Sequence, residues 1–407
     1  MSIRCFLGTA TAVAKVMTFT PANVEIGDVF TITLTDDAGH SAAIVYTAIA
    51  ATVKDVVEGL KALAVAAKTA GTIPWTLCTA TEDDAILTLT AATAGVPFYA
   101  ATSAVNGGAT DDQTLTAATP TANSGPSDIS VAANWTGAAV PISSDEVRFE
   151  NSDIDVLYGL NQSAVTGLTL RIAASFTGDF GDHSVAGSGY VQYGATVVEI
   201  GYNYGASSPS GSPRIKLDTG SQAAKIIVHD ANSSPIESYL PTVRLKTNSA
   251  TAELTVRKGR VGVACELASE TSRVNKVFVS YVEDQANDAD LQIGPGVTID
   301  TGVYKTGGSC VVQAACPVLA NYAGEAQIVG AGAVTTLELD DGTVYADSTG
   351  TITAANVNGG VLDMTRSNQA RTVTTLNRKG AGMLRYDKTV VTVTNLNTNG
   401  PVELAAA

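Results

Sequence analysis

Four successive segments near the C-terminus decide the fold of this chain: TTLELDDGTVY (335–345), TAANVNGGVLD (353–363), TTLNRKGAGML (374–384) and TNLNTNGPVEL (394–404). Each segment holds a short β-prone run, a turn rich in Asn, Asp or Gly, and a second short β-prone run. Their glycines at 342, 360, 380 and 400 are 18, 20 and 20 residues apart. A strand-turn-strand unit at this spacing is typical of one coil of a parallel β-solenoid.

The residue types of the repeats suit the interior and the corners of such coils. Gly and Asn tolerate left-handed backbone conformations, so we expect both at the corners. The repeat is detectable from about Gly294, with units of 16 to 20 residues. Because strand direction is invisible in a sequence, an antiparallel β-sandwich stays open as the alternative for this C-terminal domain. In the solenoid, the interior would be filled by Leu337, Leu339, Val344, Val357, Leu362, Leu376, Leu384 and Leu396.

The first part of the chain predicts a small α+β domain. Residues 28–35 alternate between polar and apolar types, and DDAG at 36–39 is a hairpin loop leading to a partner strand at 41–47. One helix is predicted after Thr52, which can cap it, with Asp55 three residues on. Further strands are expected at 13–20, 75–80, 85–90 and 98–104.

We therefore expect a mainly β protein in four parts. These are an N-terminal arm (1–14), an α+β domain (15–120), a linker (121–128) and a β-solenoid, or parallel β-helix-like, domain (129–407). Trp135, near the entry of the solenoid, is expected to cover the open end of its apolar core.

Composition limits the possible functions. The net charge is −15 and no basic cluster is present, which opposes nucleic-acid binding. No apolar stretch is long enough to span a membrane, and the N-terminus has no typical export signal, so we expect synthesis in a cytoplasm. The five cysteines are scattered, unlike a disulfide framework, although Cys310 and Cys316 could pair across a coil turn.

The chain offers no candidate catalytic constellation. Asp284, Asp288 and Asp290 form the best carboxylate cluster and Asp340–Asp341 the second, but both are expected at solvated corners. The acidic run 82–84 does not match a calcium loop, and the three histidines are isolated. We therefore expect no enzyme activity, no cofactor and no metal.

Several stretches carry a resemblance to a known family. They are VEIGDVFTIT (24–33), LTLTAATAGVPF (87–98), TANSGP (121–126), ANWTG (133–137) and LYGLNQSAV (157–165). Together with the Gly-rich repeats, they resemble structural proteins encoded among the virion genes of tailed bacteriophages. The resemblance implies a capsid decoration (cement) protein on the phage head, homotrimeric, with the major capsid protein or other virion proteins as partners. Such a protein is made in the host cytoplasm and ends in the virion.

Two further expectations concern binding. The N-terminal arm lacks a regular pattern, so we expect it to contact a neighbouring virion protein through Arg4, Phe6 and Leu7. The alternative function is a tail fibre or spike that binds the host surface. Its candidate sugar-stacking residues are Tyr190, Tyr193, Tyr202 and Tyr204.

Overall fold

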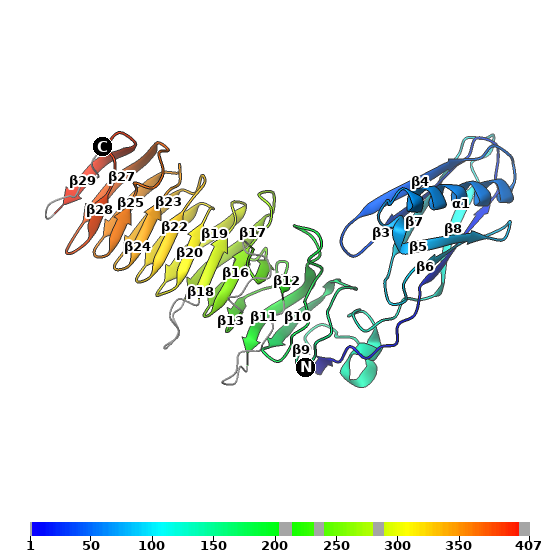
Figure 1. Ribbon diagram of the computed structural model, residues 1–407, viewed down its shortest axis with the longest axis horizontal. Coiled ribbons are helices and arrows are strands. Elements are labelled where there is room, and N and C mark those ends of the chain that lie inside the picture. The colour runs from blue at the N-terminus through cyan, green and yellow to red at the C-terminus, as the bar shows by residue number, and fades with distance from the viewer. Residues whose placement is uncertain (1, 203–213, 232–239, 280–288, 399–407) are drawn as a thin grey trace. The chain divides into compact units, whose positions relative to one another are not determined.

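The computed structural model describes residues 2–202, 214–231, 240–279 and 289–398 (Figure 1). The chain divides into two compact units. The solenoid unit comprises Met1–Phe6, Pro141–Asp153 and Asn161–Ala407, and the sandwich unit comprises Leu7–Val140 and Ile154–Leu160. Each unit is therefore built from separate stretches of the sequence.

The solenoid unit contains two ladders of parallel strands. A strand of one coil pairs with the corresponding strand of the next coil, so that Leu337 lies opposite Ala355. The longer ladder runs through β1 (Ile3–Phe6), β9 (Glu146–Phe149), β10 (Asn161–Ala173), β11 (Val191–Tyr202), β13 (Lys225–Val228), β15 (Glu253–Val256), β17 (Ser272–Val279), β19 (Val297–Lys305), β21 (Cys316–Asn321), β23 (Val334–Leu339), β25 (Ile352–Val357), β27 (Arg371–Arg378) and β29 (Val391–Thr398).

The second ladder begins where β11 pairs with β12. It contains β12 (Ile215–Asp218), β14 (Val243–Lys246), β16 (Gly259–Val263), β18 (Ala289–Ile293), β20 (Ser309–Val312), β22 (Glu325–Ile328), β24 (Thr343–Ala346), β26 (Val361–Asp363) and β28 (Met383–Arg385). Every strand pairing in this unit is parallel among the described residues, so the solenoid prediction is confirmed and the antiparallel alternative is wrong.

Aliphatic rows fill the interior of the coils. Leu337, Ala355 and Leu376 occupy one register position on successive strands and are fully buried. Seven of the eight predicted interior residues are likewise buried. Leu396 continues the same row but is 43% exposed, because β29 is the last described strand of its ladder.

Glycine and asparagine have different roles in the repeats. Gly324, Gly342, Gly360 and Gly380 occupy corners with φ between 58° and 77°, as predicted. No described asparagine of the repeats has a positive φ, so that part of the prediction was wrong. Three asparagines instead form an outward ladder on Glu338: Asn356 donates to its carboxylate (2.6 Å), Asn377 to Asn356 (2.7 Å) and Asn397 to Asn377 (2.8 Å). These bonds tie four coils together.

The first coil of the solenoid includes the very start of the chain. β1 pairs in parallel with β9, and Phe6 lies opposite Phe149 with ring centroids 5.2 Å apart. Phe149 also contacts Phe176 and Phe180 edge to face, at 5.6 and 4.9 Å. Four phenylalanines therefore fill the core here. Trp135, expected to cover this end, belongs to the sandwich unit, where its Nε1 donates to the Ile129 carbonyl (2.8 Å).

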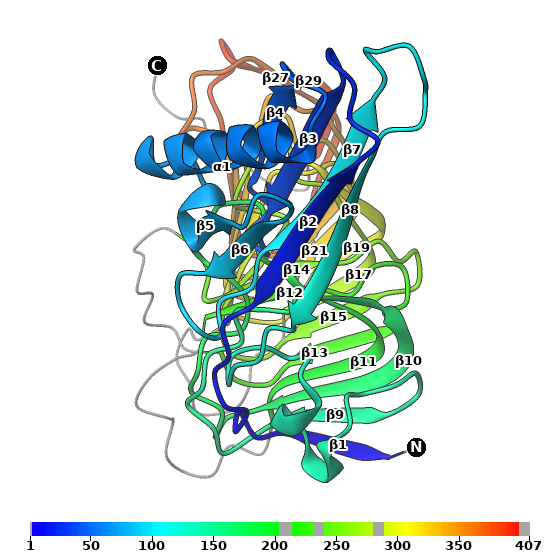
Figure 2. The same cartoon turned by 90° about the vertical axis from the view of Figure 1, so that its right-hand side faces the viewer.

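The sandwich unit consists of two antiparallel sheets and one long helix (Figure 2). One sheet has the strand order β5-β6-β2-β8 and the other has the order β4-β3-β7. The bounds are β2 (Val16–Ala22), β3 (Val29–Thr35), β4 (Ser41–Thr47), α1 (Val53–Thr69), β5 (Cys78–Glu82), β6 (Leu87–Ala91), β7 (Tyr99–Val105) and β8 (Thr114–Thr121), with 3-10 turns at Trp75–Leu77, Ala132–Asn134 and Thr136–Ala138.

Helix α1 closes one side of this core. The Thr52 hydroxyl accepts from the Asp55 N–H at 3.3 Å, which confirms the predicted cap. The Asp55 carboxylate in turn accepts from the N–H groups of Ile49 and Ala50. Val56, Val57 and Leu60 are fully buried against both sheets. The helix thus joins the outer strands β4 and β5 across a shared core.

The two units do not follow the expected linear division. The predicted arm splits after Phe6, and the predicted linker lies within the sandwich unit, which extends to Val140 and also takes Ile154–Leu160. The chain crosses between the units several times, and such discontinuity leaves no trace in local composition.

Candidate functional site

The outer surface of the sheet β4-β3-β7 contains no acidic or basic residue. β-Branched residues alternate along β3, so that Phe30, Ile32 and Leu34 face the core and their neighbours face outward. The strand register places these outward residues side by side on three strands. We call this surface the valine face: Val29, Thr31, Thr33, Thr35, Ser41, Ala43, Val45, Thr47, Tyr99, Ala101, Ser103 and Val105.

The register of the valine face is held at both ends by buried or half-buried carboxylates. Asp28, at the start of β3, accepts from the N–H groups of Gly107 (3.0 Å) and Gly108 (3.3 Å), just after β7. These bonds hold the pKa of Asp28 below its usual value. At the other end, Asp37 accepts from the Tyr99 hydroxyl at 3.2 Å. Burial raises the pKa of Asp37 to about 6.

Large apolar side chains of the valine face are open to solvent. Val45 is 55% exposed, Val105 57% and Tyr99 39%, and Ile49, two residues beyond β4, is 75% exposed. The largest apolar patch on a protein surface is often functional. The valine face is therefore our candidate functional site.

The second sheet presents a contrasting surface, which we call the threonine face. It too lacks acidic and basic residues, but its only large apolar side chain is Val16, which is half-buried. Hydroxyl groups dominate instead. Its outward residues are Val16, Thr18, Thr20, Thr79, Thr81, Thr88, Thr90, Thr116, Ala118 and Thr121.

None of the three predicted partner-binding residues belongs to either face. Arg4 forms an ion pair with Asp145 (3.7 Å) within the solenoid unit, and Phe6 is 1% exposed in the aromatic cluster. Leu7, at 44% exposed, is the one of the three with a large accessible surface. Phe6 thus contributes to its own core rather than to an open surface.

A buried ionic cluster lies on the second ladder of the solenoid. Lys216 on β12 and Arg244 on β14 are adjacent in register, and both contact the Glu266 carboxylate, Lys216 at 3.1 Å. Burial lowers the pKa of Lys216, although Glu266 opposes this. Burial acts to raise the pKa of Glu266, but the Gly187 N–H and Lys216 outweigh it, so the pKa lies below its usual value.

A second ion pair, Lys246 with Glu270, belongs to the same cluster. Lys246 forms an ion pair with Glu270 (2.7 Å) and lies 4.1 Å from the centroid of the Tyr190 ring. The Tyr190 hydroxyl donates to Glu270 at 3.1 Å. Opposite charges satisfy one another here, which fits a structural clamp between consecutive coils and the loop around Gly187.

The tyrosines proposed for sugar stacking do not form an open platform. Tyr190 and Tyr193 are buried, Tyr202 donates to Glu150 (3.1 Å), and Tyr204 lies outside the described residues.

The predicted aspartate clusters and the predicted Cys310–Cys316 pair do not form a site in the described residues. Asp290 pairs with Arg260 (3.1 Å), while Asp284 and Asp288 lie outside the described residues. Asp340 accepts from Asn358 at a corner. All five cysteines are described and none forms a disulfide, Cys310 and Cys316 included.

Three carboxylates form a group in the sandwich unit. Carboxylate oxygens of Glu58, Glu82 and Asp84 lie within 4.8 Å of one another. Lys54 pairs with Asp84 (2.8 Å) and Lys61 with Glu82 (3.2 Å), so lysine ammonium groups already supply positive charge to this group.

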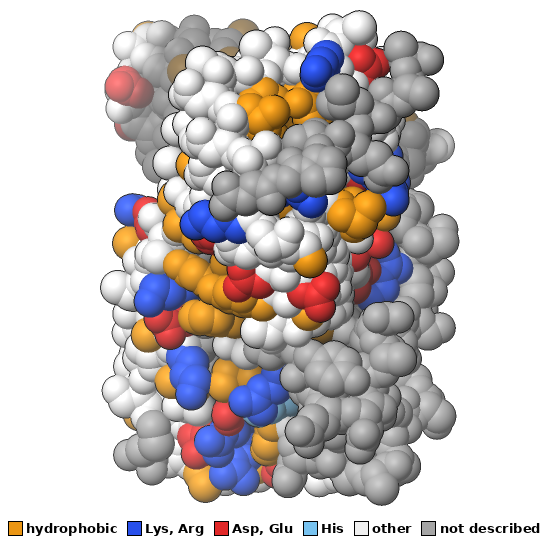
Figure 3. Space-filling model, turned by 90° about the vertical axis from the view of Figure 1, so that its left-hand side faces the viewer, with side chains coloured by type: hydrophobic (Ala, Val, Ile, Leu, Met, Phe, Trp, Pro, Cys, Tyr) orange, Lys and Arg blue, Asp and Glu red, His pale blue; other side chains and the backbone are white. Residues whose placement is uncertain are grey.

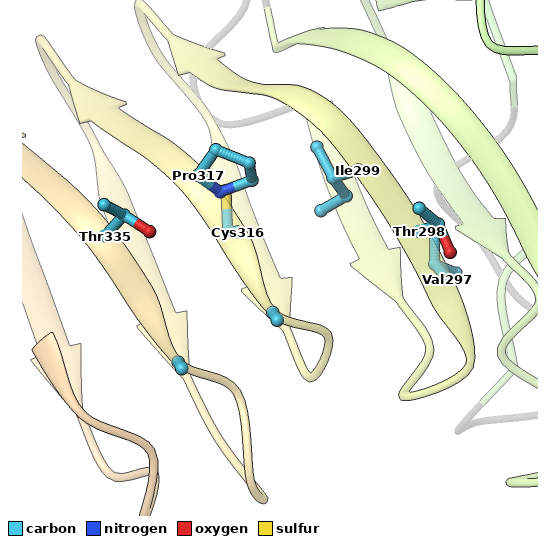
Figure 4. Close-up of a pocket in the computed structure, with 8 residues that line it drawn as sticks. Val297, Thr298, Ile299, Cys316, Pro317 and Thr335 are labelled. Carbon is cyan, nitrogen blue, oxygen red and sulfur yellow. The ribbon is translucent and has the colours of Figure 1, made fainter.

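Two hollows adjoin on one side of the solenoid and share Thr298. The first, of about 280 Å³, crosses β19, β21 and β23 and is lined mainly by apolar groups (Figure 4). It opens because β19 pairs with β21 only over Val303–Lys305, which leaves Val297–Ile299 without a ladder partner on that side. The lining residues are Val297, Thr298, Ile299, Ala315, Cys316, Pro317, Ala333 and Thr335.

The second hollow, of about 460 Å³, is polar. Its cations are already balanced, since Lys246 pairs with Glu270 and Arg273 forms two short contacts with Asp300 at 3.0 Å. Asp218, Asn248 and Ser272 add acceptors and donors. The mixture suits a hydrogen-bonding ligand without strong net charge.

The last described coil exposes apolar groups as well. Leu396 and Met383 are partly accessible, and the view toward this end shows hydrophobic side chains among polar ones (Figure 3). Nothing in the described residues indicates what covers them.

Comparisons with known proteins add no identity. No protein-family profile, no curated protein and no solved structure matches this chain at a significant level. Among the described residues, no helix combines the length and apolar character needed to cross a bilayer.

Proposed function

We propose that this chain is a structural protein of a tailed-bacteriophage virion, acting as a capsid decoration protein on the head surface. One observation carries the proposal: an acidic protein presents two sheet faces free of charge on a small domain, while its solenoid unit pairs the buried Lys216 and Arg244 with Glu266. Flat faces without charge suit protein contacts, because no ionic group has to be dehydrated on docking. The resemblance to phage structural proteins supports the same interpretation.

In this proposal the two units have different tasks. The sandwich unit attaches to the particle through one of its charge-free faces, and the solenoid unit contributes a rigid body of stacked coils. Each coil is supported by its neighbours, so the unit can be long without a large globular core.

The test is the location and number of the chains in purified particles of the encoding phage. Quantitative mass spectrometry is expected to find hundreds of copies, and antibody labelling is expected to place them on the head. Absence from particles would contradict the proposal.

A second function is favoured by the two adjoining hollows. A tail fibre or spike would bind the host surface along this side of the solenoid, with the polar hollow around Asn248 and Arg273 contacting hydroxyl-rich ligands. A few copies at the tail tip, and loss of host adsorption in Asn248→Ala with normal particle assembly, would support this function instead.

A further inference from the structure

The valine face has the composition of a surface that is covered by another protein. Its strands contribute valine, threonine, alanine and serine, with Tyr99 at one end, and no Asp, Glu, Lys, Arg or His. Natural sheets usually guard their edge strands, here β4 and β7, with charged residues, lysine above all, against unwanted association. No such residue guards these strands. We propose that the valine face is the surface through which two copies of this chain associate.

The charge of the chain indicates that the partner of the valine face is a second copy of this chain. At a net charge of −15, identical chains repel one another wherever acidic surfaces meet. On the valine face, as on the threonine face, the residues add no charge to this repulsion, and only the valine face also exposes several large apolar side chains. A basic partner, by contrast, would find no carboxylate there to bind. The face therefore fits a partner that is itself neutral at the contact, and the same face of another copy meets that requirement.

The arrangement of side chains also suits pairing with itself. In a twofold contact the same patch faces its own copy, so large and small groups must alternate within one surface. On the valine face, Val45 lies beside Thr31 and Val105 beside Val29, while Ala43 and Ala101 flank Thr33 at the centre. Along both outer strands, large side chains at one end thus give way to alanines at the centre, which supplies the large and small groups that a self-complementary face needs.

The area of the valine face limits how tightly two copies can associate. Three strands of four outward residues each cover roughly 400 Å², given about 4.8 Å between strands and about 6.8 Å between outward residues. Two copies would bury roughly 800 Å² in total, which is below the range of about 1,200 to 2,000 Å² for stable interfaces and typical of weak, transient ones. The association is therefore weak in dilute solution and strengthens where copies are held close together, as on a particle.

Sedimentation of the full chain over a range of concentrations tests the proposal with two matched variants. Thr33→Glu places a carboxylate at the centre of the valine face, and Thr88→Glu places one on the central strand β6 of the threonine face. We expect the mean mass of the wild type and of Thr88→Glu to rise together with concentration, while Thr33→Glu stays monomeric. A monomeric wild type at every concentration, or an equal response of the two variants, would overturn the proposal.

Thr33→Glu could lose association simply because it misfolds. Two further measurements, a salt series and a conservative variant, test the proposal independently of that variant. Raising ionic strength from about 0.01 M to about 1 M shortens the Debye length from about 30 to 3 Å, which removes repulsion between the acidic chains. Wild-type association should therefore strengthen with salt, and weakening would contradict a neutral contact. The double variant Val45→Thr/Val105→Thr keeps β-branched residues and should still fold, with association reduced at least several-fold; unchanged association would also count against the proposal.

The outcome separates this inference from the proposed function. If the wild type is monomeric in solution but Thr33→Glu is lost from particles, the valine face binds a different virion protein, and self-association is wrong. If the chain associates through this face but is absent from particles, self-association stands and the virion function fails.

Discussion

The two units of this chain differ in where their charged residues lie. Among the Asp, Glu, Lys, Arg and His residues, the strands of the sandwich unit contain only Glu82, at the end of β5. Strands of the solenoid unit carry such residues from end to end, and even its interior holds Lys305, which is fully buried. Both units are β-structures rich in Thr and Val, so the secondary structure itself does not impose this difference.

The difference shows where each unit makes its contacts. In the solenoid, charges link one coil to the next: Arg171 on β10 bridges Glu146 and Glu199 on the neighbouring strands, each at 2.7 Å. Ionic groups therefore serve internal cohesion. In the sandwich, cohesion comes from the shared apolar core, and both outer faces stay neutral. A neutral outer face has no internal task, which is why we assign the external contacts to this unit.

The largest expected effect tests whether the solenoid behaves as coils that support one another. Leu376→Asp buries a carboxylate in the aliphatic row and should cost several kcal/mol, whereas Thr375→Asp on the outer side should stay within about 0.5 kcal/mol. Hydrogen exchange should show lost protection from Val334 to Thr398 and no change over Val16–Val105. Loss in both regions at once would show that the two units unfold as one.

The buried ionic cluster should give the next largest effect. Glu266→Gln removes the carboxylate shared by Lys216 and Arg244, and breaking such buried pairs costs about 3 to 5 kcal/mol. Lys54→Met, which removes an exposed ion pair in the sandwich unit, is the control and should leave stability unchanged. The readout is hydrogen exchange of β12 and β14. If the two substitutions changed stability equally, the buried ion pairs of the solenoid would contribute no more than an exposed pair of the sandwich unit.

Lys305 gives the solenoid a stability that rises with pH. Burial lowers its pKa from 10.5 to about 8, while Cys310 and Glu325 oppose the shift. Between these values the unfolded state binds more protons, so stability increases from about pH 8 toward pH 10, by about 2 to 3 kcal/mol. Denaturation of wild type and Lys305→Met at several pH values isolates this contribution as their difference. A difference independent of pH would show that Lys305 is solvated.

Asp37 gives the sandwich the opposite trend at lower pH. Burial and the nearby Asp128 raise its pKa from 3.8 to about 6, against the hydrogen bonds from Gly159 and Tyr99. The folded state then binds more protons, so stability falls as pH rises from about 4 to 6, by about 1 kcal/mol after solvent screening. Both tryptophans lie in this unit, so their fluorescence reports its unfolding. Asp37→Asn should abolish the slope, and an unchanged slope would assign it to another group.

Sequence reasoning recovered the elements whose signals are local. The 18- to 20-residue repeat predicted stacked coils, and Gly342 and Gly360 marked their corners. The Thr52 cap and the apolar spacing after it predicted helix α1. In each case the relevant residues lie within one turn or one coil of each other.

Features that depend on distant pairing were missed. β1 joins the solenoid through β9, which lies about 140 residues later, so the sequence alone predicted an N-terminal arm that contacts a neighbouring protein. The valine face requires β3 and β7 to pair in register across some 70 residues, and only its β3 row was visible as alternation. Its one local signal was the lack of charge on alternate positions of three separate strands. The Asn356–Asn377–Asn397 ladder likewise became visible only through the register of successive coils.

The central claim, that the sandwich unit rather than the solenoid attaches this chain to a virion, is tested most directly by occupancy on particles. Full-length wild type, Thr33→Glu/Thr88→Glu and Thr375→Asp would each be supplied to particles lacking the protein, and the bound copies counted by quantitative mass spectrometry. We expect near-complete loss for the double variant, which places a charge on both neutral faces, and wild-type occupancy for Thr375→Asp. Full occupancy of the double variant, or loss with Thr375→Asp alone, would contradict the account.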